Sequence, residues 1–90
     1  MRAIVNNHHT DFIMAVIYDT DNTYKLQFTS MKDNRGATYP CHSYRDAARR
    51  FVANCRFYDV PVPHIPTEAE FLGVEEGTLW PKEVTTCLRA

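Results

Sequence analysis

Two segments in the first third of the chain have the hydrophobic patterns of β-strands. Residues 12–18 are apolar without interruption, and their length and β-branched side chains favour a strand that is buried on both faces. In residues 24–30, apolar and polar side chains alternate from Tyr24 onwards, as in a strand with one buried face. Because a polar turn at 19–23 joins the two segments, we expect them to form a hairpin.

A third strand is predicted over residues 37–39, after a polar turn at 32–36. Pro40 has no N–H to donate to a neighbouring strand, so it should end this strand or lie at the edge of the sheet.

Residues 43–57 have the pattern of an amphipathic helix. Ser43 is the expected N-cap, and Asp46 three residues later forms a variant of the capping box. At about 100° per residue, six side chains share one arc of this helix: Tyr44, Ala47, Ala48, Phe51, Val52 and Cys55. We expect this arc to cover one face of the sheet.

The chain after this helix is predicted to be extended and then briefly helical. Pro61, Pro63 and Pro66 forbid a helix in residues 58–66 and favour a stiff, extended strap. A short helix should follow, because Thr67 and Glu70 have the spacing of a capping box. Residues 84–88 are predicted to be a last strand or a packed tail.

These elements predict a single α+β domain over residues 1–90. It consists of a three-stranded antiparallel sheet packed on one main helix (β-β-β-α), then an extended proline-rich strap, a short helix and a C-terminal tail. Residues 12–57 would be the sheet–helix core, 58–66 the strap, and 67–90 an acidic C-terminal cover. The strap and this C-terminal part would together lie over the second face of the sheet. If that face stays uncovered, a homodimer would bury it. Its contacts would be Phe12, Met14 and Val16, or Ile13, Ala15 and Ile17.

The composition is that of an ordinary globular chain, with 44% hydrophobic residues, 23% charged residues and a net charge of −1. The charge is unevenly distributed. Residues 31–56 carry six basic and two acidic residues, a net +4, whereas residues 57–90 carry two basic and six acidic residues, a net −4. The chain is therefore not expected to bind polyanions generically, and it could present two faces of opposite sign to partners.

The chain has no pattern typical of a catalytic or metal site. Its three cysteines form no Cys-x-x-Cys pair, which favours reduced thiols in a cytoplasm over a zinc site. The pairs His8–His9 and Cys41–His42 are adjacent in sequence, so in a strand their side chains would point to opposite faces. Cys41, His42 and Ser43 are contiguous, which is not how a nucleophile and its base normally meet, and no glycine-rich phosphate loop is present. We therefore predict a non-enzymatic protein without cofactor or metal. The longest apolar run is far below the ~20 residues of a membrane span, so no membrane partner is expected.

Binding to a protein partner is the remaining class, and the main helix offers the best surface for it. Arg45, Arg49 and Arg56 lie within about 40° of one another around the helix axis, and Tyr58 follows at its end. Tyr and Arg are enriched in binding hot spots, so we predict that these four residues contact the partner. An acidic surface that imitates the charge of nucleic acid is the alternative; its residues are Glu68, Glu70, Glu75 and Glu76.

The order of three strands and a helix, with Ser43 to Ala48 opening the helix, resembles DNA-binding domains of the AP2 and integrase-arm types over residues 12–55. This resemblance implies nucleic-acid binding through the outward face of the sheet. In residues 24–30 that face offers Lys25, Gln27 and Thr29, while the arginines lie on the helix. Nucleic-acid binding is therefore the alternative function.

Residues 15–19, Ala-Val-Ile-Tyr-Asp, precede a second strand, a polar turn and a helix that carries Cys55. This arrangement resembles the T7-type phage inhibitor of host dGTP triphosphohydrolase, and the small size without catalytic motifs resembles anti-CRISPR proteins. The resemblance implies a phage or mobile-element type inhibitor that docks on a host protein or defence complex in the host cytoplasm and blocks it.

Overall fold

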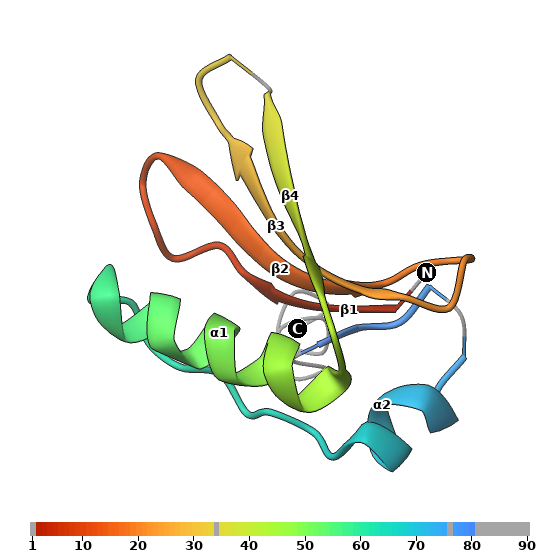
Figure 1. Ribbon diagram of the computed structural model, residues 1–90. Helices are drawn as coiled ribbons and strands as arrows, with labels where there is room; N and C mark the ends of the chain where they lie inside the picture. Colours follow the sequence, from red (N-terminus) through yellow and green to blue (C-terminus); the bar gives the residue numbers. More distant parts are fainter. Residues whose placement is uncertain (1, 34, 76, 81–90) are drawn as a thin grey trace, which may run out of the picture.

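The described part of the protein is a mixed β-sheet with two helices and an extended strap on the same side of it (Figure 1). A computed structural model describes residues 2–33, 35–75 and 77–80. The five strands of the sheet lie in the order β4-β3-β2-β1-β5. They are β1 (Arg2–Asn6), β2 (Phe12–Tyr18), β3 (Tyr24–Ser30), β4 (Gly36–Cys41) and β5 (Leu79–Trp80).

The α+β class is confirmed, but the sheet has five strands instead of three, and it is mixed. β1 pairs with β2 antiparallel along its whole length, from Arg2 opposite Tyr18 to Asn6 opposite Met14. β5 is two residues long and lies parallel to β1. β1 carries only three apolar residues, and β5 pairs with a segment at the other end of the described chain. Their state is therefore set by the partner strand and not by a local alternating pattern.

The predicted hairpin of β2 and β3 is present, with Phe12 opposite Ser30 and Tyr18 opposite Tyr24. β4 follows antiparallel to β3 and forms one edge of the sheet, so Pro40 lies on an edge strand as expected. The β3–β4 hairpin extends beyond the rest of the sheet in Figure 1. This projection leaves the side chains of β4 largely exposed.

The core lies between one face of the sheet and α1 (Tyr44–Phe57). Ile4, Met14 and Val16 point to this face from the central strands, and all are at most 1% exposed. α1 packs onto them through a buried stripe that includes Phe51 and Cys55. The helix begins where the sequence predicts, because the side chain of Ser43 accepts a hydrogen bond from the N–H of Asp46 at 3.1 Å.

The strap and α2 (Glu68–Gly73) lie on the same side of the sheet as α1 (Figure 1). The predicted capping box of α2 is confirmed, with Thr67 and Glu70 bonded reciprocally. Phe71 is fully buried in the cluster that also holds Phe51, and Ile65 packs against that cluster. Our expectation that these residues cover the second face of the sheet is therefore wrong for the described part of residues 58–80. The rest of the predicted C-terminal cover, including the tail at 84–88, lies outside the described residues.

The second face of the sheet is apolar near its centre and partly exposed. Ile13 and Ile17 of β2 are half-buried there, and Ala15 between them is buried. Met14 and Val16, which belong to the other residue set considered for a homodimer, are enclosed beneath α1 instead. A dimer through that set would require the core to open.

Two buried tyrosines should make the fold sensitive to alkaline pH. Tyr44 donates its hydroxyl hydrogen bond to the carbonyl oxygen of Pro66, and burial raises the pKa of this hydroxyl to about 12. Tyr24 donates to Glu68 Oε2 at 2.8 Å, and burial together with this bond raises the pKa of Tyr24 still further. An unfolded tyrosine titrates near pH ~10, so the unfolded chain loses these protons first. Stability should therefore be complete below pH ~10 and fall as the pH rises from there toward about 12.

Urea unfolding measured at pH 8 and at several values above 10 would test this expectation. Tyr44→Phe should be less sensitive to alkaline pH than the wild type. Tyr39→Phe is the matched control, because Tyr39 is 51% exposed. Equal alkaline sensitivity of all three proteins would contradict the assignment to Tyr44.

Candidate functional site

The three arginines predicted from the helical pattern line one groove beside α1. This arginine groove has a volume of about 550 Å³ and runs between α1 and Ile65 of the strap. Arg45, Arg49 and Arg56 are exposed. The remaining lining residues are Tyr44, Ala48, Val52, Ala53 and Ile65. The groove thus combines a mainly apolar lining with three cationic side chains.

The positive charge of this groove is only slightly neutralised. Arg49 Nη2 lies 3.5 Å from Asp46 Oδ1, but the arginine side chain is 78% exposed. Solvent therefore screens this ion pair, and the interaction between the two charges is weak. Within the described ranges, neither Arg45 nor Arg56 forms a hydrogen bond or an ion pair through its side chain. Two full charges of the groove are therefore available to a partner.

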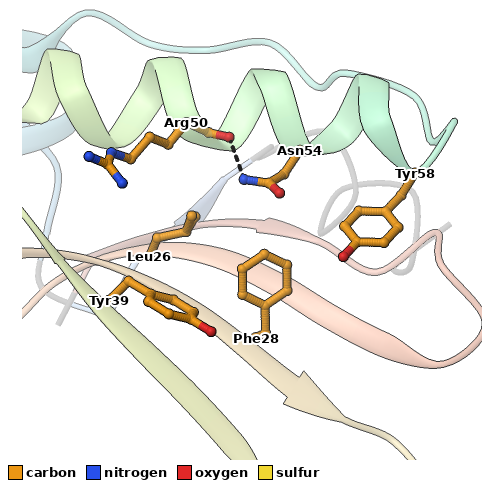
Figure 2. A pocket seen from close by; sticks show the side chains of 6 residues that line it. All are labelled: Leu26, Phe28, Tyr39, Arg50, Asn54 and Tyr58. Atoms are coloured by element: carbon orange, nitrogen blue, oxygen red, sulfur yellow. Dashed lines mark hydrogen bonds between the residues drawn. The ribbon is translucent and has the colours of Figure 1, made fainter.

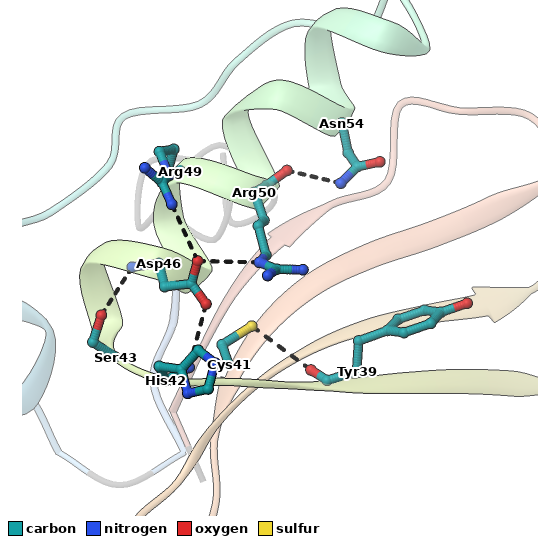
Figure 3. Close-up of polar contacts among 8 residues, drawn as sticks. All are labelled: Tyr39, Cys41, His42, Ser43, Asp46, Arg49, Arg50 and Asn54. Atoms are coloured by element: carbon teal, nitrogen blue, oxygen red, sulfur yellow. Dashed lines mark hydrogen bonds and ion pairs between the residues drawn. The ribbon is translucent and has the colours of Figure 1, made fainter.

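Arg50 does not line this groove and pairs with Asp46 instead. Arg50 Nε donates to Asp46 Oδ1 at 3.1 Å, and the backbone N–H of His42 donates to Asp46 Oδ2 at 3.3 Å (Figure 3). The hydrogen bond from Arg50, followed by the one from His42, holds the pKa of Asp46 below its usual range. Asp46 therefore stays ionised at neutral pH and serves as an anchor at the start of α1.

Tyr58 lies on the opposite flank of α1 from the arginines. It lines a hollow of about 340 Å³ between α1 and the sheet, which we call the aromatic cleft. Figure 2 shows the side chains of this cleft facing one another across the gap. They are Leu26, Phe28, Tyr39, Arg50, Asn54 and Tyr58. The structure therefore separates Tyr58 from the three arginines with which it was grouped.

The aromatic cleft continues into a second hollow of about 470 Å³ that shares Phe28 and Tyr58 with it. The ring of Tyr58 packs edge-on against Phe12 at a centroid distance of 4.8 Å, and His9 stacks on Phe12 at 4.1 Å. These contacts give the cleft a rigid aromatic wall.

Sequence reasoning missed this cleft for a clear reason. Tyr39, Arg50 and Asn54 come from an edge strand and from the helix flank opposite the arginine stripe. Nothing in the local patterns indicates that β3 and β4 would lie opposite this flank of α1. Asn54 Nδ2 donates to the carbonyl oxygen of Arg50 at 2.8 Å, so its amide oxygen is the group directed away from the helix backbone (Figure 2).

Two glutamates of the alternative acidic surface form hydrogen bonds that stabilise the fold. Glu68 accepts the hydrogen bond of Tyr24, and Glu70 belongs to the capping box of α2. Glu75 is exposed, and its carbonyl oxygen accepts bonds from Thr78. Glu76 lies outside the described residues. Glu68 and Glu70 are therefore already engaged within the fold.

The histidines and cysteines singled out from the sequence are dispersed. In the described part of the chain, no three His, Cys, Asp or Glu side chains gather as they would around a metal ion. Burial raises the pKa of the Cys55 thiol, and burial together with Asp46 raises that of Cys41. Both thiols are thus protonated at neutral pH and are poor nucleophiles.

No helix among the described residues is both long enough and apolar enough to cross a bilayer.

Comparison with known proteins gives no indication of function: no protein-family model, no curated protein and no solved structure matches the chain. The function has to be inferred from the arginine groove and the aromatic cleft themselves.

Proposed function

We propose that the protein is a non-catalytic binding module that docks on a partner protein through the arginine groove and blocks it. The observation that carries this proposal is the combination of a mainly apolar groove with Arg45 and Arg56, whose charges have no partner among the described residues. The resemblance of residues 15–19 and the following elements to phage-encoded inhibitors supports the blocking role and a host protein or defence complex as the target.

The chemistry of the groove is suited to protein recognition. Tyr and Arg side chains are enriched in binding hot spots. The guanidinium group is more weakly hydrated than an ammonium group, so covering it costs less free energy of hydration. Ala48 and Val52 supply an apolar surface beside these charges. Burying that surface would add affinity, while the arginines would select partners that carry carboxylates.

The state of the thiols supports a role without catalysis, because neither Cys41 nor Cys55 is poised as a nucleophile. Both are free, which agrees with the cytoplasm as the proposed place of action. The opposite face of the sheet gives less support to nucleic-acid binding. Its Lys25 is held by Asp19 at 3.6 Å and by Asp21 at 3.1 Å.

Charge reversal of Arg45 and Arg56, which form no ion pair within the described residues, tests the proposal. Arg45→Glu/Arg56→Glu should weaken binding to the captured partner by about 5- to 30-fold, because interfacial charges commonly contribute about 1–2 kcal/mol. The partner would be isolated by affinity capture with the wild-type protein and then measured by titration calorimetry. Circular dichroism would verify that the variant is folded.

Lys32→Glu/Arg35→Glu is the matched control. It makes the same change in net charge at the exposed β3–β4 turn, and it should leave the affinity unchanged. Equal loss in both double variants would reject the groove as the docking site. Binding to DNA or RNA at low salt that falls steeply as salt rises would instead favour the nucleic-acid alternative.

A further inference from the structure

The walls of the arginine groove offer few backbone groups to a ligand. α1 satisfies its own N–H and C=O groups internally along most of its length. On the other side, the strap lines the groove through Ile65, and its Pro61, Pro63 and Pro66 have no N–H. The carbonyl oxygen of Pro61 already accepts from Asn6 Nδ2 at 2.8 Å, and that of Pro66 accepts from Tyr44. A β-ladder along the strap would be interrupted, so an occupant should satisfy its backbone hydrogen bonds itself, as a helix does.

The spacing of the arginines also fits a helix. Arg45, Arg49 and Arg56 are four and seven residues apart, which corresponds to about 6 Å and about 10.5 Å along α1. Carboxylates that are four and seven residues apart on a second helix lie within a stripe of about 40° and repeat the same distances. A helix lying along α1 would therefore bring one carboxylate to each arginine.

The residues between the arginines permit a close approach. Ala48 and Ala53 are small, and Val52 lies between them in sequence. Packed helices have their axes about 8–10 Å apart, and small side chains at the contact favour the lower value. Ile65 on the strap forms the apolar side of the groove opposite α1.

From these observations we infer that the occupant of the arginine groove is an acidic amphipathic helix of the partner protein. Its carboxylates would be spaced by four and seven residues along one stripe, beside a stripe of apolar residues. This inference rests on the proposed function and specifies the chemistry of the partner.

A designed peptide tests this inference directly. A stapled helix of about 18 residues would carry three glutamates at the matching spacing, with leucines on the adjacent stripe; the staple is needed because short isolated helices are marginal in water. A control peptide of the same composition would place its glutamates on the opposite face. Fluorescence anisotropy at physiological salt should show the matched peptide binding at least tenfold more tightly than the control.

The reciprocal experiment uses the protein variants. The variant Arg45→Glu/Arg56→Glu should no longer bind the matched peptide, but it should bind a peptide that has lysines in place of the glutamates. The control variant Lys32→Glu/Arg35→Glu should bind both peptides as the wild type does. Equal binding of matched and control peptides, or no binding of either, would overturn the helical occupant. If a captured partner still depends on Arg45 and Arg56 in that case, the proposed function stands and only the helix is rejected. If the partner is also insensitive to the arginines, both proposals fail.

Discussion

Replacing Phe51 by alanine is expected to lower the free energy of unfolding by about 3–5 kcal/mol. The ring is fully buried at the middle of α1, in the cluster that joins the sheet, α1 and α2. Removing it costs the transfer free energy of the ring and leaves a cavity that the sheet strands cannot close without breaking their pairing. The total stability of a domain of this size is about 5–15 kcal/mol, so this single change should remove a large share of it.

Equilibrium unfolding in urea, followed by circular dichroism, would measure the effect. The matched control is Phe57→Ala, which makes the same substitution in the same helix where the side chain is 78% exposed. The control should change the stability by no more than about 0.5 kcal/mol. Similar losses for Phe51→Ala and Phe57→Ala would mean that α1 does not bury the face described above.

The second large effect is expected at Asn6, a polar side chain that is only 3% exposed. Its Nδ2 donates to the carbonyl oxygen of Pro61 at 2.8 Å and lies 3.3 Å from Cys55 Sγ, while its Oδ1 accepts from the N–H of His8 at 3.0 Å. Asn6 thus ties β1 to α1 and to the strap. Asn6→Ala should lower the free energy of unfolding by about 2–3 kcal/mol, because buried polar groups lose their partners.

Asn7→Ala is the control for this prediction, because Asn7 is the next residue and is exposed. A second variant, Asn6→Asp, keeps the acceptor for His8 but places a carboxyl group in a buried position. Burial should raise the pKa of that carboxyl above its unfolded value of about 3.9, so the variant should lose stability as the pH rises toward neutrality. If Asn6→Ala and Asn7→Ala were equally stable, the proposed tie between β1 and the strap would be wrong.

Asn6 also connects stability to the candidate site. The strap forms one wall of the arginine groove through Ile65, and Asn6 holds the strap at Pro61. Loosening this attachment should therefore weaken binding in the groove without removing any arginine. Weaker binding by Asn6→Ala would show that the position of the strap matters for the groove. If the arginines of α1 alone determined binding, this variant would bind as the wild type does.

The sequence by itself predicted the elements whose causes are local. The boundaries of α1 follow from Ser43 and from a 3.6-residue pattern, and the start of α2 follows from the reciprocal bonds of Thr67 and Glu70. The hairpin of β2 and β3 follows from two adjacent apolar segments with a polar turn between them. In each case the interacting groups are close in sequence, so a short window contains the information. The arginine stripe was predictable for the same reason.

Only the tertiary structure decided what depends on distant pairing. β5 is a strand because it pairs with β1 from the other end of the described chain, and the three apolar residues of β1 gave no strand signal without the neighbouring β2. The strap could have crossed either face of the sheet, and it lies with α1 because Asn6, Tyr44 and the pocket for Phe71 are there. Tyr58 faces the aromatic cleft because side chains of β3 and β4 lie opposite the flank of α1 that carries Arg50 and Asn54. Charge pattern and helical period thus selected the arginines, whereas the groove beside them exists only through contacts between segments far apart in the chain.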